Sequence, residues 1–250
     1  MSVTLFDCQC GFGGAGKGST AIVSAQELAD EMRRVGISRS LARIIPEDYE
    51  TDVATSNAKL YAACEGVSCL VPCPVVFPGV GPDRALEEGR VDECIRGGAG
   101  AVWLRPQLDY WLLAEWASGK LFGVLEERRL PTMCLERMIG FELVAGVAKR
   151  YPKLPIILVE ASYRSQRTLI ALMEAFSNIY FSIGAAYTVH KGIEQLVETV
   201  GPERLLFGTG FPAAEPAAAI AQLMYADISE EEKQLVGSLN LERLTGGIVR

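Results

Sequence analysis

The chain has 250 residues, a mass of 27.1 kDa and a hydrophobic content of 49%, which is enough to build one large core. Its formal charge of -7 excludes the basic surface typical of proteins that bind nucleic acid or anionic membranes. No stretch approaches the ~20 apolar residues of a membrane span, and no leader pattern precedes the first apolar run, so we expect a soluble, cytoplasmic protein.

Short apolar runs rich in β-forming residues recur along the whole chain. Segments with helical spacing separate them; in 24–36, for example, Leu28, Met32 and Val35 share one face. That segment begins with a Ser24/Glu27 capping box and ends at Gly36, and similar segments end at Pro152 and Gly201. The expected strands are 3–8, 39–45, 67–75, 99–104, 131–135, 155–160, 178–183 and 204–209.

The order of these segments predicts the fold class. Successive strands start about 23 to 36 residues apart, close to the length of a βαβ unit, and they are apolar throughout, as strands covered on both faces are. Eight such units in one chain indicate an α/β protein with a single (β/α)8 TIM barrel over residues 1–250. An open doubly wound sheet uses the same units but usually has fewer strands.

The glycine-rich stretch 11–18 resembles a phosphate-binding loop. Gly11, Gly16 and Lys17 fit that pattern, but Gly18 stands where it needs a hydroxyl. The next helix signal, at Ser24, comes too late for the helix N-terminus to complete a phosphate cradle. We therefore favour a glycine loop over the barrel mouth, and the sequence leaves its role open.

Seven cysteines occur without the paired CxxC spacing of a structural zinc site. We interpret them as reduced, packed side chains. Strand alternation places Asp7, Gln9 and Gly11 on one face and Cys8 and Cys10 on the other. If the strand has the register implied by the family resemblance described next, the two cysteines face the layer between barrel and helices.

Several motifs together resemble the amidohydrolase-related family, also called amidohydrolase 2, of metal-dependent TIM-barrel hydrolases. "LFDCQCGFG" is similar to the family's first strand, apolar-Asp-x-His-x-His-x-Gly, and "LPIILVEAS" to its sixth. "NIYFSIG" resembles the seventh strand and "GPERLLFGTGFP" the eighth, "GxDRLLFGSDYP". The end, "ADISEEEKQLVGSLNLERL", resembles the family's closing helix.

The residues that hold the family's divalent metal, zinc or another, do not carry over. The resemblance puts the two first-strand histidines at Gln9 and Gly11, the sixth-strand histidine at Glu160 and the eighth-strand aspartate, the usual base, at Gly210. The strand-five histidine would fall at Cys134 or Leu135. Glu160 alone offers a good ligand, and one carboxylate does not make a metal site. We therefore expect no metal or other cofactor.

Charged and polar residues remain at the predicted strand ends. The candidate catalytic residues are Glu160 and Glu136, which lie on neighbouring strands and can form an acid/base pair. Arg105 is either a clamp for a carboxylate or an ion-pair partner of Glu136 or Glu160. The candidate substrate-binding residues are Arg105, Asp7, Gln9, Arg43, Tyr163, Arg164 and Thr209, with Arg137 and Tyr187 also near the mouth. The single histidine, His190, lies too far past its strand to be placed in the site.

Three functions remain open from the sequence. The first is a barrel that has lost its metal centre and is catalytically silent, or binds a small molecule as a regulatory relative of a hydrolase. The second is a metal-independent hydrolase, lactonase or decarboxylase that acts on a small carboxylated substrate through Arg105 and Glu136 or Glu160; some members of the family are said to work without metal. The third is a scaffold, perhaps with a homodimer as its working form. An open, polar cavity at the strand ends favours the second function, and a mouth closed by Arg105, Glu136 and Glu160 favours the others.

Overall fold

The computed structural model describes residues 3–13, 22, 24–45 and 52–250. Within them, every strand pairs in parallel with its neighbours in chain order. Every predicted strand is confirmed, but the first begins later than expected and takes in Gly11 and Phe12 of the glycine-rich stretch. The strands are β1 (Phe6–Phe12), β2 (Arg39–Ile44), β3 (Leu70–Pro72), β4 (Val102–Leu104), β5 (Thr132–Leu135), β6 (Ile156–Val159), β7 (Ile179–Ile183) and β8 (Leu205–Phe207).

The strands form two ladders, β1–β3 and β4–β8, and single bridges join them at both seams. At one seam the Trp103 N–H donates to Pro74 O at 2.8 Å, and at the other the Gly210 N–H donates to Gln9 O at 2.8 Å. The resulting order is that of a TIM barrel, so the predicted fold class is confirmed. Residues 14–18 of the glycine-rich stretch lie outside the described residues.

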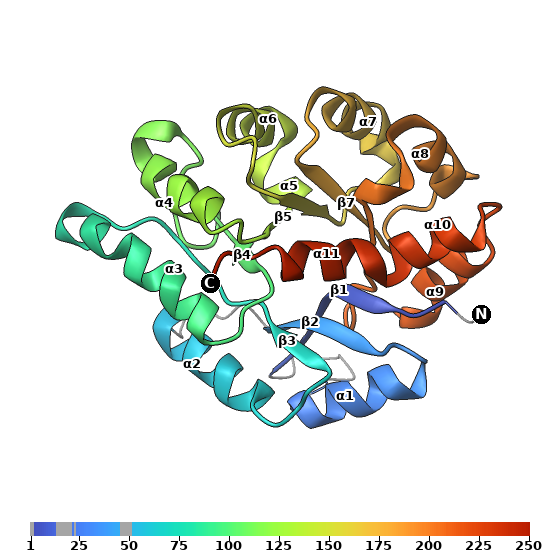
Figure 1. Ribbon diagram of the computed structural model, residues 1–250, viewed down its shortest axis with the longest axis horizontal. Coiled ribbons are helices and arrows are strands. Elements are labelled where there is room, and N and C mark those ends of the chain that lie inside the picture. Colours follow the sequence, from blue (N-terminus) through green and yellow to red (C-terminus); the bar gives the residue numbers. More distant parts are fainter. Residues whose placement is uncertain (1–2, 14–21, 23, 46–51) are drawn as a thin grey trace.

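Helices surround the ring of strands (Figure 1). The predicted Ser24/Glu27 capping box is present at the first of them, with Glu27 N donating to Ser24 Oγ at 3.2 Å. The α-helices are α1 (Ala25–Arg34), α2 (Val53–Cys64), α3 (Glu87–Arg96), α4 (Glu115–Glu127), α5 (Glu136–Ile139), α6 (Phe141–Arg150), α7 (Gln166–Ala175), α8 (Gly192–Val200), α9 (Pro216–Met224), α10 (Glu230–Gln234) and α11 (Asn240–Gly246). Short helical turns are η1 (Gly81–Leu86), η2 (Tyr163–Ser165), η3 (Pro202–Arg204) and η4 (Leu235–Leu239), the last with π-helical bonding.

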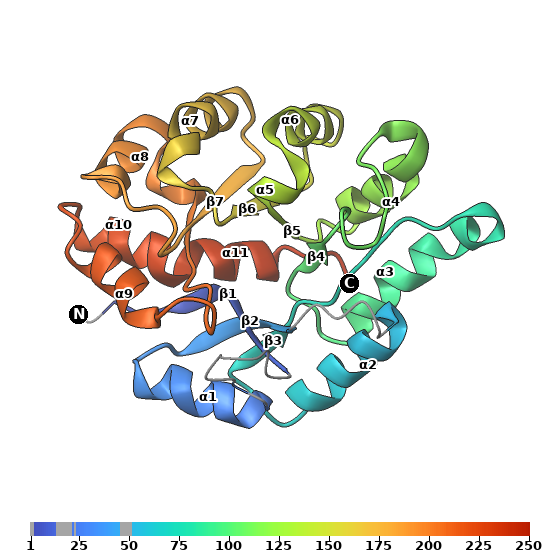
Figure 2. The same ribbon diagram turned by 180° about the vertical axis from the view of Figure 1, so that it is seen from behind.

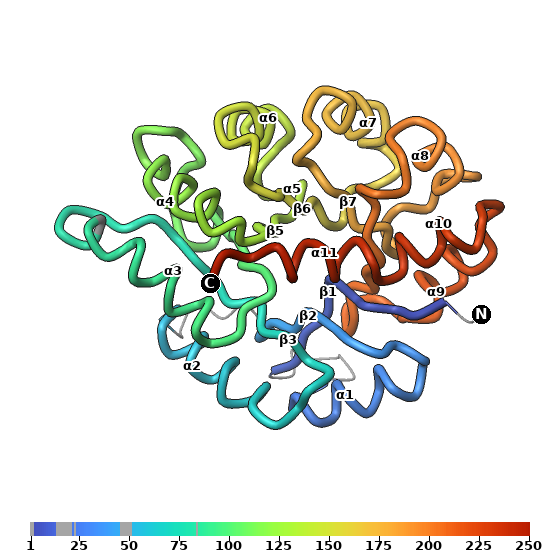
Figure 3. Tube along the Cα trace, viewed as in Figure 1, coloured from blue at the N-terminus to red at the C-terminus, as the bar shows by residue number. Residues whose placement is uncertain are grey.

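An apolar cluster fills the barrel interior and is separate from the larger apolar cluster that includes the helices. Nearly every strand contributes to it, and its buried members include Phe6, Leu41, Trp103, Met133 and Leu206. Leu241 and Leu244 of α11 belong to the same cluster. Figures 1 and 2 show α11 crossing the middle of the ring, and the trace in Figure 3 follows it to the C-terminus. Because α11 packs against the barrel interior from one side, it leaves the opposite, carboxyl ends of the strands for a site.

The prediction for the first-strand cysteines is wrong for Cys8. A β-bulge between Asp7 and Cys10 breaks the alternation of β1, so Cys8 joins the barrel interior while Cys10 packs toward the helices. All seven cysteines are free thiols, as predicted. Burial raises the pKa of the Cys8 thiol well above its usual range, which favours the protonated form.

No helix in the described part of the chain is both long and apolar enough to span a membrane.

Candidate functional site at the carboxyl ends of the strands

A cavity of about 320 Å³ opens at the carboxyl ends of β1, β6, β7 and β8. Its charged lining residue is Glu160, which directly follows β6. The other lining residues come from the adjacent strand ends and loops: Gln9, Ala161, Ser182, Gly184, Ala185, Ala186, Tyr187, Thr209, Gly210, Ala213 and Ala214. The structure therefore brings the predicted Gln9, Glu160 and Thr209 together around one open space.

Glu160 is held in an unusual conformation. Its φ of 58° lies in the left-handed region, which costs a non-glycine residue roughly 1 kcal/mol or more. The Gln9 side-chain amide donates to Glu160 Oε1 at 2.7 Å, and Arg137 Nη2 donates to Oε2 at 3.3 Å. The side chain stays 28% exposed. Glu160 is thus a partly exposed carboxylate that lines the cavity and is held by two donors.

Asp7 lies beneath this pair and is fully buried. Its carboxylate accepts hydrogen bonds from Gln9 N at 2.8 Å, Thr209 N at 3.0 Å and Thr209 Oγ1 at 2.5 Å. Burial raises the pKa of Asp7 to about 6, although these hydrogen bonds act in the opposite direction. The predicted role of Asp7 in substrate binding is not supported, because its carboxylate is enclosed and instead links β1 to the end of β8.

Another part of the cavity wall is the turn from Gly184 to Tyr187, closed by Tyr187 N donating to Gly184 O at 2.9 Å. Within the described part of the chain, the N–H groups of Gly184, Ala185 and Ala186 have no backbone acceptor. The hydroxyls of Ser182 and Tyr187 are buried and also lack a well-formed hydrogen bond among those residues. The lining of the cavity therefore includes polar groups of this turn whose hydrogen-bonding capacity is not used.

Arg105 and Arg43 lie elsewhere on the mouth, beside a narrow cleft of about 10 Å³. Arg105 Nε pairs with Asp109 at 2.9 Å, so the predicted pairing with Glu136 or Glu160 is wrong. Asp109 lies in the loop after β4, four residues from Arg105, and reaches it without crossing the barrel. The Arg43 guanidinium stacks over the Trp103 ring at 4.5 Å.

The remaining predicted residues do not line the cavity. Glu136 begins α5 and accepts a long, 3.5 Å hydrogen bond from Ser165, so no acid/base pair with Glu160 forms. Arg164 donates to the Tyr163 hydroxyl at 3.1 Å, and both side chains lie on the exposed surface. His190 is exposed just before α8.

The donor set does not fit the divalent metal that the resemblance implies. Among the described residues, no group of three or more His, Cys, Asp or Glu side chains converges on one point. A Cβ at Gly11 would lie 2.8 Å from the Arg43 carbonyl oxygen, so the backbone of β2 occupies the place of a histidine side chain. At Gly210 the space is open, but its φ of 72° disfavours any other residue.

Sequence reasoning missed two parts of the site. The sequence identified Arg137 as a polar residue near a strand end, but not as the partner of Glu160. The two residues are 23 positions apart, one in α5 and the other after β6, so no short sequence pattern indicates their ion pair. The backbone donors after β7 have no side-chain signal at all. A turn of small residues directly after a strand, here "GAA", was the one available hint.

Comparisons with known proteins agree with this fold. A family model described as amidohydrolase, Amidohydro_2, matches residues 31–246. No protein of curated function matches the chain by sequence.

Solved structures resemble it over nearly the whole length. An uncharacterised TIM-barrel protein from Bordetella bronchiseptica has a TM-score of 0.76 at 15% identity, covering 98% of this chain and 99% of that one. 5-Carboxyvanillate decarboxylase from Sphingomonas paucimobilis has a TM-score of 0.75 at 14% identity, covering 99% and 100%. A putative 2-pyrone-4,6-dicarboxylic acid hydrolase from Pseudomonas putida has a TM-score of 0.73 at 16% identity, covering all of both chains. At these identities the likeness is one of fold.

The family match spans most of the chain, and we conclude that the chain belongs to the amidohydrolase family Amidohydro_2.

Proposed function

We propose that this chain is a metal-independent hydrolase of small carboxylated esters or lactones, with Glu160 as its general base and acid. The observation that carries the proposal is the Glu160 carboxylate, held between Gln9 and Arg137 at the edge of a cavity of about 320 Å³. A silent barrel closed by its own ion pairs is less consistent with this arrangement, because Arg105, Glu136 and Glu160 each have other partners.

In the proposed reaction, Glu160 takes a proton from a water molecule while the water oxygen attacks the ester carbonyl carbon. The negative charge that develops on the carbonyl oxygen is stabilised by backbone N–H donors of the Gly184–Tyr187 turn. When the carbon–oxygen bond of the ester breaks, Glu160 returns the proton to the leaving oxygen. The products are a carboxylic acid and an alcohol, and no redox partner is needed.

The substrate carboxylate is assigned to Arg137. Its side chain does not itself line the cavity; it is 65% exposed and gives one N–H to Glu160, which leaves further donors for a ligand that extends past Glu160. The name of the Pseudomonas putida neighbour describes a hydrolase for a cyclic ester with two carboxylates, and that chemistry agrees with this arrangement. The putative hydrolase therefore suggests the first substrates to test.

The experiment is hydrolysis by metal-stripped protein of carboxylated lactones, including 2-pyrone-4,6-dicarboxylate, and of matched lactones without a carboxylate. We expect turnover of the carboxylated compounds, and a loss of about 10²- to 10⁴-fold in Glu160→Gln, the usual contribution of a general base. Glu142→Gln, an exposed substitution on α6, is the matched control. Saturable binding without turnover would reject the catalytic role and favour a silent binding protein.

A further inference from the structure

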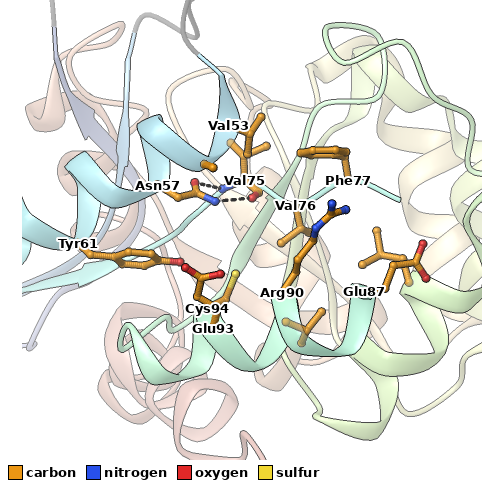
Figure 4. A pocket seen from close by; sticks show the side chains of 13 residues that line it. Val53, Asn57, Tyr61, Val75, Val76, Phe77, Glu87, Arg90, Glu93 and Cys94 are labelled. Atoms are coloured by element: carbon orange, nitrogen blue, oxygen red, sulfur yellow. Dashed lines mark hydrogen bonds between the residues drawn. The ribbon is translucent and has the colours of Figure 1, made fainter. Parts of the chain in front are cut away.

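A second cavity, of about 180 Å³, lies between α2, α3 and the segment that follows β3 (Figure 4). None of its lining residues lines the cavity at the barrel mouth. Since one water molecule takes about 30 Å³ of liquid, the space suits about six waters or one single-ring organic molecule. Its apolar walls are Val53, Val75, Val76, Phe77, Val91 and Leu121.

One wall of this cavity is fixed by Asn57 of α2. Its side-chain amide donates to Val75 O at 2.8 Å, and its carbonyl oxygen accepts from Val75 N at 2.9 Å. Figure 4 shows both bonds. Because both ends of the amide bond the backbone of Val75, Asn57 fixes α2 to the segment after β3 and so fixes this wall.

Three charged residues of α3 line the same cavity: Glu87, Arg90 and the exposed Glu93. The first two, one helical turn apart, have unmet hydrogen-bonding capacity. Glu87 is 1% exposed; its Oε1 accepts from Gly79 N at 2.8 Å, while its Oε2 has no partner in the described part of the chain. Arg90 Nη2 contacts Asp83 at 3.3 Å, but its buried Nη1 has no hydrogen-bond partner there either. In Figure 4 the Arg90 guanidinium turns toward Phe77, and the Glu87 carboxylate points away from it.

A buried acceptor and a buried donor that both lack partners carry a desolvation cost, which a ligand offering the opposite groups removes. A carboxylate would satisfy Arg90 but repel Glu87, and an ammonium would do the reverse. A carboxamide offers both groups at neighbouring atoms: a C=O for Arg90 and an N–H for Glu87. The Phe77 ring and the valine walls suit a planar apolar ring attached to that amide.

We propose that the cavity between α2 and α3 is a second ligand site, which takes a small planar molecule with a carboxamide edge recognised by Glu87 and Arg90. The site is independent of the reaction proposed for the barrel mouth. It lies on the outer, helical layer of the barrel, so a ligand there need not enter the ring of strands.

Titration calorimetry of the full chain with benzamide, benzoate and benzylamine tests this proposal. We expect saturable binding of one benzamide, with affinities for the two charged analogues at least tenfold weaker. Glu87→Gln removes the negative charge that repels a carboxylate, while the glutamine carbonyl oxygen can still accept the ligand N–H, so benzoate should bind more tightly than to the wild type and the preference for benzamide over benzoate should be lost. Glu88→Gln, on the exposed face of α3, should bind like the wild type.

Two further variants locate the binding. Ala54→Trp fills the cavity from the exposed side of α2 without disturbing buried residues, and it should abolish benzamide binding. Glu160→Gln should leave that binding unchanged, because Glu160 belongs to the other cavity. The proposal is overturned if folded wild-type protein shows no saturable benzamide binding, if Glu87→Gln keeps the wild-type preference, or if Glu160→Gln removes binding.

Discussion

The Gln9 side-chain amide donates a 2.7 Å hydrogen bond to the Glu160 carboxylate and so links the first strand to the end of the sixth. These two residues stand where the resemblance puts metal-binding histidines. Their hydrogen bond connects the two strand ends directly.

The amide of Gln9 positions the proposed base, so its removal should reduce the rate. Gln9→Leu deletes the donor to Glu160, and we expect kcat to fall by about tenfold or more, which corresponds to roughly 1.4 kcal/mol of transition-state stabilisation. Steady-state kinetics measures this, with Gln195→Leu on the exposed face of α8 as the control. An unchanged kcat in Gln9→Leu would show that Gln9 does not position Glu160 for the reaction.

Asp7 makes stability depend on pH. Its pKa is raised from 3.8 to about 6 by burial, so its contribution to stability is fully present below pH 3.8 and is lost as pH rises through 6. The loss is about 3 kcal/mol, from roughly two pKa units at ~1.36 kcal/mol each. Urea unfolding between pH 4 and 7 measures it. The Asp7→Asn side chain can keep the bonds to Gln9 N and Thr209, so in this variant the fall of the unfolding free energy between pH 4 and 7 should be smaller by this amount. The same fall in the variant and the wild type would show that Asp7 is not its source.

The close approach of β2 to Gly11 predicts a steric effect. A Cβ there would lie 2.8 Å from Arg43 O, so Gly11→Ala should lower the free energy of unfolding by about 1–3 kcal/mol. Gly146→Ala on α6 is the matched control: its Cβ meets nothing within 4 Å, and it should gain about 0.5–1 kcal/mol. Equal effects of the two substitutions in chemical denaturation would show that β2 does not fill this space.

Two buried tyrosines should respond differently to loss of the hydroxyl. Tyr187→Phe removes an oxygen without a well-formed hydrogen bond and keeps the ring contact with Phe181 at 5.2 Å, so stability should be unchanged or rise by up to about 1 kcal/mol. Tyr151→Phe removes a 2.7 Å hydrogen bond to Glu115 and should cost about 1 kcal/mol. Thermal unfolding of both variants measures the difference, and a larger loss for Tyr187→Phe would contradict the hydrogen-bond assignment.

The fold could be predicted from the sequence because its signals are local. Strands covered on both faces must be apolar throughout, and the Ser24/Glu27 capping box marks a helix start within four residues. The side-chain pairings of the site follow no such signal. Arg105 pairs with Asp109, four residues on in its own loop, and not with a glutamate of another strand end, while Glu160 pairs with Arg137 of α5, the helix after the preceding strand.

Other features had no distinct sequence signal. The bulge that turns Cys8 into the barrel follows from how β1 pairs with β2, which strand alternation alone cannot reveal. Glu87 and Arg90 resemble any charged pair on the solvent face of a helix. Only the three-dimensional packing shows that Glu87 is buried and that the two charges do not meet.

The most direct test of the central claim is the hydrolysis rate of carboxylated lactones by metal-stripped protein, measured before and after addition of zinc or manganese, for the wild type and Glu160→Gln. The account predicts the same wild-type rate with and without metal, and a rate at least 10²-fold lower in Glu160→Gln. A wild-type protein that is inactive until metal is added, or a Glu160→Gln variant with wild-type activity, would contradict it.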